Sequence, residues 1–490
     1  MTIRTTFMAL LTATSLFAGT TIAQPGKSPL VTFRLVFQTG AASDPKGKEG
    51  LASLTAAMLA DGGSKKMTYQ QRIDALFPMA ASIEWNVDKE MTTFSAETHI
   101  DNLEKFYAIF RDALLDPGWR EEDLRRLKDD MINSLRIALR SNNDEELGKE
   151  VLYSTIYKSH PYEHHNLGRV SAIQSITAAD LQKFYKANYT AANLTIAIAG
   201  GYPTDFAARI EKDFAALAKG TAGKVKLPEP APIKGRHLVM VEKQTRSVAI
   251  SFGFPIAVKR GDPDFVPLLV AQSWFGQHRN SGVRLFDRIR EKRGLNYGDY
   301  AYIEYFPEGM FRFEPEPNLA RQQQIFQIWI RPVQPSTAHF TLRLAAFELE
   351  SLVRDGMTQD AVAQTKNFLS KYVNLLTKTK RAELGYAIDS QFYGIAEYNA
   401  YLKSALAKVT RDDVNRVIRK YLKPENMTIV VIGQDTAKLR DAIVNNTPSP
   451  MQYNSPKPDD ILQEDKVVEK LKLNIPAANT KIVKVETLFE

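Results

Sequence analysis

The spacing of apolar residues predicts both strands and helices in this chain. From Ile83 to Ala96 apolar and polar residues alternate, which is typical of a strand with one buried face. Between Arg120 and Leu139, leucine and methionine recur every three or four residues, which gives a helix one apolar face. We expect the first part of the chain to form strands Val31–Thr39 and Ile83–Ala96 and helices Glu49–Leu59, Asn102–Leu115 and Arg120–Leu139.

One segment of the chain occurs twice. Residues 176–200 and 409–433 align without a gap. Each copy opens with a threonine, Thr177 or Thr410, which an aspartate follows three residues later, as in a helix capping box. An amphipathic helix, an asparagine turn and a β-branched strand that ends in glycine complete each copy. The repeat is too long for a solenoid unit and predicts two homologous α+β halves.

Composition marks the boundary between the halves. Residues 219–236 contain three prolines and three glycines and have neither a helical nor a strand period, so they are expected to form a linker. We therefore assign residues 30–220 to the first half, 221–236 to the linker and 237–436 to the second half, which opens with a strand at His237–Phe254. Residues 437–490 are polar and contain several prolines, and the sequence does not place this tail.

The first residues have the layout of a secretory signal peptide. Arg4 precedes an apolar stretch from Phe7 to Gly19, and the small residue Ala23 comes shortly before Pro25. We expect residues 1–23 to be removed by cleavage near Ala23, which gives an exported protein of the periplasm or another extracytoplasmic space. The alternative is an uncleaved membrane anchor, but the apolar stretch is shorter than the roughly 20 residues that span a bilayer.

The composition excludes several classes of protein. Lys and Arg number 64 and Asp and Glu 56, and the net charge of +8 is not concentrated in a basic stripe, so nucleic acid is not an expected partner. The chain has no cysteine, which removes disulfides, thiolate metal sites and cysteine nucleophiles. The motifs of serine hydrolases, P-loop ATPases and dinucleotide-binding enzymes are also missing.

Three patches of the sequence carry a resemblance to a known family. They are Phe33–Ala52, His160–Tyr162 and Leu285–Tyr297. On these patches and on the duplication, the chain from about Val31 to Asp435 resembles the pitrilysin/insulinase-type zinc peptidases, the inverzincins. The resemblance implies an α+β fold of two homologous halves, each a mostly antiparallel sheet covered by helices, that together form a clam-like chamber.

The chain departs from this family at the residues that bind zinc. Family members carry H-x-x-E-H on the helix after the first strand, where two histidines bind zinc and the glutamate acts as general base. The matching positions here are Ser53, Ala56 and Ala57, which cannot replace those groups. The family's third ligand, a glutamate on a later helix, falls near Asn133 and Ser134. We therefore predict a lost zinc site, no cofactor in this chain and no catalytic residue in isolation.

A second string also reads H-x-x-E-H. His160, Glu163 and His164 have this spacing, but Pro161 and the nearby Gly168 favour a loop over a helix. We interpret the string as a structural or surface loop. A relocated zinc site at these three residues stays an alternative, since proline is compatible with the first position of a helix.

The second half retains another feature of the family. In family members an arginine and a tyrosine, which match Arg290 and Tyr297, reach the zinc site and hydrogen-bond the substrate carbonyl. From spacing alone, Arg290 would complement a helix dipole in a last turn and Tyr297 would pack in a strand. With the resemblance, we expect both residues to bind substrate.

These observations favour a non-catalytic subunit of an exported zinc peptidase. The resemblance implies a heterodimer in which a homologous partner binds zinc, while this chain supplies Arg290, Tyr297 and half of the chamber for a peptide. Two alternatives stay open. One is a scaffold or binding protein of the same fold without proteolytic role, and the other is an independent zinc endopeptidase with its metal at His160, Glu163 and His164.

Overall fold

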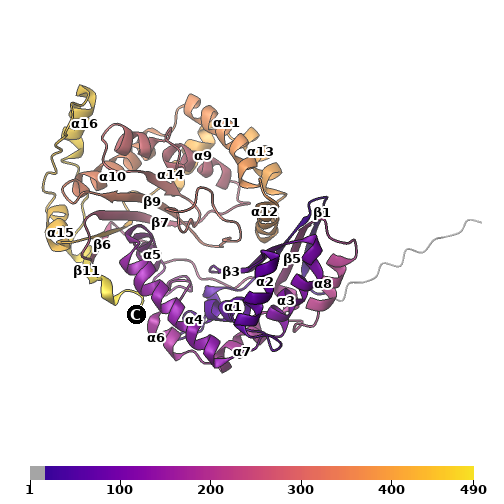
Figure 1. Ribbon diagram of the computed structural model, residues 1–490. Helices are drawn as coiled ribbons and strands as arrows, with labels where there is room; N and C mark the ends of the chain where they lie inside the picture. The colour runs from indigo at the N-terminus through magenta and orange to yellow at the C-terminus, as the bar shows by residue number, and fades with distance from the viewer. Residues whose placement is uncertain (1–16) are drawn as a thin grey trace, which may run out of the picture.

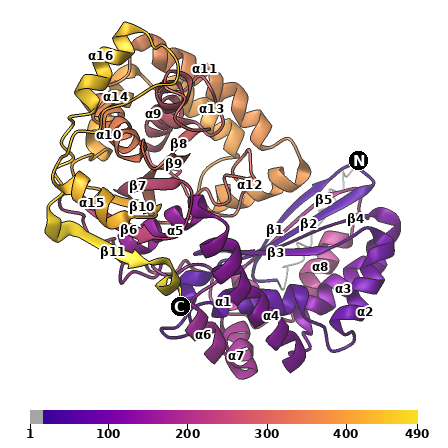
Figure 2. The same ribbon diagram turned by 60° about the vertical axis from the view of Figure 1, so that its left-hand side comes forward.

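The chain folds into two halves, each built on one β-sheet. The computed structural model describes residues 17–490. In Figure 1 the first sheet and its helices, in indigo and magenta, lie opposite the second sheet and its helices, in brown to yellow. Figure 2 shows the same two halves facing each other from another side. The predicted α+β fold of two halves around a chamber is confirmed.

Each sheet is mostly antiparallel. The first has the strand order β1-β5-β2-β4-β3 and the second β11-β6-β10-β7-β9-β8. The strands of the first sheet are β1 (Thr20–Pro25), β2 (Leu30–Phe37), β3 (Ile83–Val87), β4 (Thr92–His99) and β5 (Leu194–Gly200). Those of the second are β6 (His237–Glu242), β7 (Val248–Ile256), β8 (Asp299–Tyr302), β9 (Gln324–Val333), β10 (Thr428–Gly433) and β11 (Thr480–Lys484). Only the pairs β1–β5, β6–β10 and β6–β11 run parallel among these strands of residues 17–490.

Helices connect the strands and cover the sheets. The first half contains α1 (Leu51–Asp61), α2 (Tyr69–Leu76), α3 (Leu103–Leu115), α4 (Glu121–Asn133), α5 (Asp144–Ile156), α6 (Val170–Ser175), α7 (Ala178–Asn188) and α8 (Phe206–Phe214). The rest of the chain contains α9 (Phe265–Gly276), α10 (Ala338–Asp355), α11 (Gln359–Leu376), α12 (Lys380–Tyr393), α13 (Tyr398–Lys408), α14 (Arg411–Tyr421), α15 (Thr436–Val444) and α16 (Asp459–Val468). Two π-helical turns, η4 (Ser134–Ser141) and η6 (Phe286–Glu291), follow α4 and precede β8.

The repeated segment forms the same unit in both halves. In α7 the Thr177 hydroxyl accepts a hydrogen bond from the Asp180 amide at 3.2 Å, and the Asp180 carboxylate accepts one from the Thr177 amide at 2.9 Å. Thr410 and Asp413 make the same capping box at the start of α14. The strands that follow, β5 and β10, each have one parallel and one antiparallel neighbour. The predicted duplication is therefore visible in the topology.

Two of the expected strands are in fact pairs of strands. The alternating stretch Ile83–Ala96 forms the hairpin of β3 and β4, in which Val87 pairs with Thr92. The stretch His237–Phe254 is divided between β6 and β7. The turn between β3 and β4 holds the three consecutive charged residues Asp88 to Glu90, which interrupt the alternation and are buried in the structure.

Each sheet is packed by a helix from the other half of the sequence. Helix α5 packs on β7, β9 and β10 of the second sheet. Helix α12 packs on β1, β2 and β5 of the first sheet, as Figure 2 shows. The halves are therefore interlocked rather than joined only by the linker.

A buried ion pair joins the halves at the hairpin turn. The Arg321 guanidinium, before β9, donates to both Asp88 carboxylate oxygens at 2.8 and 2.5 Å. Both side chains are buried, and the guanidinium also lies 3.6 Å from the centre of the Tyr305 ring. Burial alone would raise the pKa of the Asp88 carboxyl, but the neighbouring Arg321 holds it below its ordinary value.

The C-terminal tail returns to the first half. After α16 the chain adds β11 to the edge of the second sheet and ends beside α6, as Figure 1 shows. Phe489 is buried there, and its carbonyl accepts a hydrogen bond from the Val170 amide at 2.9 Å. The Glu490 carboxylate pairs with Arg136 at 2.7 Å and Arg140 at 2.6 Å. The tail, which the sequence could not place, is a strap between the halves.

The N-terminal strand β1 overlaps the end of the expected signal peptide. Residues 1–16 lie outside the described residues, but β1 covers Thr20–Pro25 and pairs along its whole length with β5. Cleavage near Ala23 would remove four of the six strand residues, and the cleavage position stays a prediction. Among the described helices none combines the length and apolar character needed to cross a membrane.

We expect a chain that starts at Gln24 to melt at a lower temperature than a chain that starts at Gly19. The shorter chain loses most of the pairing between β1 and β5. Differential scanning calorimetry of the two purified chains measures the difference. Equal melting temperatures would mean that β1 is dispensable and would leave cleavage near Ala23 in place.

Replacing Asp88 by alanine should destabilise the fold by about 3–5 kcal/mol, because the Arg321 charge is then left buried without its counter-ion. Urea unfolding followed by circular dichroism measures the change. The carboxyl pKa is lowered in the folded state, so the wild-type contribution is complete above the ordinary carboxyl pKa and disappears as the pH falls through the lowered value.

The control for Asp88→Ala is the double variant Asp88→Leu, Arg321→Met, which removes both charges. It should be more stable than the single variant. A double variant as unstable as Asp88→Ala would show that the two side chains do not act as a pair.

Candidate functional site

Helix α1 carries the positions that match the zinc motif. The Asp44 carboxylate accepts hydrogen bonds from the Gly50 and Ala52 amides, both at 2.7 Å, and so fixes the start of the helix. Gly50 has a φ of 103°, and a Cβ there would lie 2.5 Å from the Leu167 carbonyl oxygen. Glycine is thus required for the close contact between α1 and the loop that precedes α6.

The side chains at the motif positions are engaged in packing. Ser53, Ala56 and Ala57 are all buried. The Ser53 hydroxyl donates a hydrogen bond to the Asn166 carbonyl oxygen at 2.6 Å. The two alanines offer only methyl groups. Of the two positions considered for the third ligand, Asn133 is exposed, and the Ser134 hydroxyl donates to the Asp130 carbonyl oxygen at 2.8 Å.

Ser53 and Ser134 line a cleft of about 720 Å³ between the two halves. Its other walls come from the first sheet, η4, α5, the loop before α6 and the long loop between β8 and β9. The edge strand β3 lines it with four successive residues, Glu84 to Val87. The position of the family's zinc site is therefore a cleft in this chain. Within residues 17–490 no group of three or more His, Asp or Glu side chains is placed to hold a metal ion.

The side chains of the alternative metal site, His160, Glu163 and His164, each interact with a different partner. The His160 ring accepts from the Tyr162 amide at one nitrogen, and the other lies 3.0 Å from the Pro228 carbonyl oxygen. Burial lowers the pKa of His160. The Glu163 carboxylate accepts from the Ser159 amide at 2.7 Å. The His164 ring lies 3.1 Å from the Asp44 carboxylate that caps α1. The three side chains are not brought together, and they hold the loop against its surroundings.

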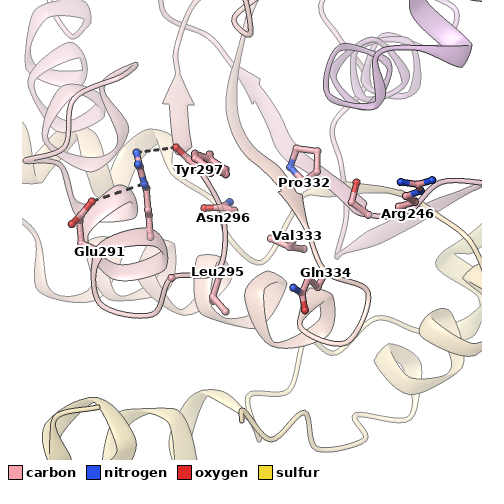
Figure 3. Close-up of a pocket in the computed structure, with 11 residues that line it drawn as sticks. Arg246, Glu291, Leu295, Asn296, Tyr297, Pro332, Val333 and Gln334 are labelled. Carbon is pink, nitrogen blue, oxygen red and sulfur yellow. Dashed lines mark hydrogen bonds and ion pairs between the residues drawn. The ribbon is translucent and has the colours of Figure 1, made fainter. Parts of the chain in front are cut away.

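Arg290 and Tyr297 lie in a second pocket, of about 550 Å³, on the second half. The Arg290 guanidinium donates to the Tyr297 carbonyl oxygen at 3.2 Å and lies 5.4 Å from the centre of the Tyr297 ring. The Tyr297 side chain is 75% exposed. Figure 3 shows Tyr297 and Glu291 on one side of this pocket and Arg246 on the other.

The turn that carries Arg290 is fixed by ion pairs to helix α16 of the C-terminal tail. Arg288 and Arg293, on either side of Arg290, are buried. The Arg293 guanidinium pairs with Glu464 at 2.7 Å and Asp465 at 2.8 Å, both on α16. Helix α16 thus fixes η6, a role of the tail that the sequence did not reveal because the charges involved are far apart along the chain.

The two sets of residues singled out in the sequence occupy separate pockets. The cleft is lined by Ser53 but not by Arg290 or Tyr297. The second pocket is lined by Arg290 and Tyr297 but not by Ser53. Within one chain the arginine and tyrosine therefore do not share a cavity with the former zinc positions. An oxygen atom bound by Arg290 and Tyr297 has to be presented at the exposed second pocket.

Comparisons with known proteins agree with this architecture. Residues 21–169 match the family model described as insulinase (peptidase family M16), and residues 175–369 match the peptidase M16 inactive domain. An uncharacterized zinc protease of Rickettsia bellii is 23% identical over 413 residues, which cover 82% of this chain and 92% of that protein. A probable mitochondrial-processing peptidase subunit beta of Arabidopsis thaliana is 24% identical over 224 residues, 45% of this chain and 42% of that protein.

Solved structures show the same fold. The peptidase M16 inactive domain from Pseudomonas fluorescens superimposes with a TM-score of 0.74 at 24% identity, covering 85% of this chain and 96% of that one. The periplasmic protease PqqL from Escherichia coli gives a TM-score of 0.67 at 14% identity, covering 92% of this chain and 49% of that one. Together with the family models of both halves, these similarities show that the chain belongs to the pitrilysin/insulinase family of peptidases, M16.

Proposed function

We propose that this chain is a non-catalytic subunit of an exported zinc peptidase, which supplies Arg290, Tyr297 and half of a chamber to a zinc-bearing homologous partner. One observation carries the proposal. The motif positions hold buried Ser53, Ala56 and Ala57, while Arg290 and Tyr297 are presented together in a separate, open pocket. We infer that this pair acts on a substrate whose zinc is bound by a second chain.

The chemistry of the pair fits this role. Arg290 offers a permanent positive charge and Tyr297 a phenolic hydroxyl, and both can donate a hydrogen bond to the carbonyl oxygen of a peptide. Zinc bound in the partner would supply an activated water. As that carbonyl gains negative charge, Arg290 and Tyr297 stabilise the developing oxyanion. Removing one such donor typically costs about 10²–10³ in rate.

The relatives support a two-chain arrangement. The Arabidopsis relative is named as a subunit beta of a processing peptidase, a name that refers to a multi-subunit enzyme. A Caenorhabditis elegans relative with the same name is 23% identical over 229 residues, 45% of this chain and 48% of that protein. Export remains part of the proposal and rests on the signal-peptide layout of the first residues.

With a zinc-bearing homologous partner, Arg290→Ala and Tyr297→Phe should each lower kcat about 10²–10³-fold, because the oxyanion loses a donor. Steady-state hydrolysis of a quenched fluorescent peptide measures the effect. Arg246→Ala, in the same pocket but not a proposed donor, is the matched control and should change kcat much less. Unchanged turnover in both donor variants would favour a scaffold of the same fold.

The isolated mature chain, dialysed free of loosely bound metal, should contain well below one zinc per chain. The motif positions lack ligands, and His160 and His164 are held by other partners. Inductively coupled plasma mass spectrometry gives the metal content. A value near one, lost in His160→Gln and His164→Gln, would instead support the independent endopeptidase.

A further inference from the structure

Among the described residues that line the cleft between the halves, one arginine has no carboxylate as counter-ion. Its carboxylates outnumber its arginines, and nearly all of these groups are paired. Arg381 pairs with Glu84, Arg312 with Glu308 and Glu316, Lys149 with Glu146, and Glu150 accepts a hydrogen bond from Tyr305. Arg34 is the exception. Arg34 lines the cleft, and among the residues described its guanidinium forms no ion pair with a carboxylate.

Neutral oxygens hold the Arg34 side chain in place. Its Nε donates to the Asn318 side-chain oxygen, and one terminal nitrogen donates to the Pro317 carbonyl oxygen at 3.1 Å. The other terminal nitrogen, Nη1, has no hydrogen-bond partner within residues 17–490. The buried Asp389 carboxylate accepts hydrogen bonds from the Asn318 amide and side-chain nitrogens at 3.0–3.1 Å and lies 3.8 Å from the Arg260 guanidinium.

This arrangement is costly without a ligand. Only 4% of Arg34 is exposed, and a buried charge without a partner opposes folding. Burial, together with the nearby Arg381, lowers the pKa of Arg34 to about 10. The free Nη1 carries N–H groups without an acceptor, and a carboxylate is an acceptor to which a guanidinium donates strong, charge-assisted hydrogen bonds.

The surroundings of Arg34 favour a carboxylate on a peptide over a free anion. Arg34 lies on β2, opposite Ser95 of β4, which in turn lies opposite Glu84 of β3. Strand β3 is the sheet edge and lines the same cleft, so an extended peptide can pair with it. The surplus of glutamates repels a small multivalent anion that makes no other contact. The cleft volume lies within the range of about 300–1,000 Å³ that is usual for ligand sites.

We propose that the cleft of this chain binds a peptide that carries a carboxylate, and that Arg34 receives this carboxylate. That the ligand is a peptide rests on the proposed function, whereas the preference for a carboxylate rests on the unpaired guanidinium. The carboxylate belongs either to an acidic side chain or to the C-terminus of the peptide. The site is formed by one chain and requires neither the partner nor Arg290 and Tyr297.

Isothermal titration calorimetry on the isolated full-length chain tests the proposal. The probes are four forms of one valine- and threonine-rich octapeptide: with a central glutamate and a free C-terminus, with glutamine in its place, with a C-terminal amide, and with both changes. The form without any carboxylate should bind at least 10-fold more weakly than the first. Whichever single change causes this loss identifies the source of the carboxylate.

Arg34→Gln should abolish the difference between the acidic and the neutral peptide, and Arg34→Lys should keep part of it. Arg312→Gln, at the same cleft but on a side chain already paired with glutamates, should leave the difference in place. If Arg34→Gln does not fold, the affinities of the four peptides for the wild-type chain and for Arg34→Lys still test the proposal.

Equal affinity of the acidic and neutral peptides for the wild-type chain would overturn the proposal, as would a difference that survives in Arg34→Gln. Inorganic phosphate that binds as tightly as the acidic peptide would also overturn it, because the peptide would then contribute nothing. A failure of this proposal can be distinguished from a failure of the proposed function, because Arg290→Ala and Tyr297→Phe are tested with the partner and do not line this cleft.

Discussion

The pairing of Asp88 with Arg321 fixes how the two halves of the molecule meet. Asp88 lies in the turn between β3 and β4 of the first sheet, directly after β3. Arg321 lies in the long loop that precedes β9 of the second sheet. Asp88 also accepts a hydrogen bond from the Asn166 side chain at 3.0 Å, and the Asn166 carbonyl holds Ser53. One buried carboxylate therefore determines the spacing of the halves and the conformation of the loop beside the former zinc positions.

The interlocked helices explain why the cleft has walls from both halves. Helix α5 places Glu146 and Glu150 against the loop between β8 and β9, where Lys149 donates to the Phe306 carbonyl oxygen at 2.9 Å and Tyr305 donates to Glu150 at 2.9 Å. Because α5 belongs to the first half and the loop of Tyr305 to the second, neither half can form the cleft alone. The second pocket, by contrast, is lined entirely by residues of the second half.

Local patterns predicted the repeated units but not the contacts between them. The capping boxes at Thr177 and Thr410 are formed by neighbours in sequence, so a short window contains all the necessary information. Helix α5 shows the limit. Its charged first turns look like an exposed surface, yet Glu145 and Lys149 are buried because their partners, Arg331 and the Phe306 carbonyl, are more than 150 residues away. For the same reason, nothing in the sequence distinguished Arg34 from other strand residues.

The two pockets differ in how their residues are supported, and this difference bears on function. At α1 the motif positions hold small, uncharged side chains that are buried by packing. Apolar packing does not depend on the exact orientation of a side chain in the way that a hydrogen bond does. At η6 two buried arginines, Arg288 and Arg293, are fixed by ion pairs to α16 and, for Arg288, to Glu348 at 2.9 Å. Buried ion pairs are a costly way to stabilise a turn but an effective way to set its orientation. A hydrogen-bond donor such as Arg290 depends on that orientation, since misplacement by about 1 Å can cost 10²-fold in rate. The ion pairs to α16 and Glu348 thus orient the turn that carries Arg290, whereas the motif positions of α1 hold buried side chains without charge.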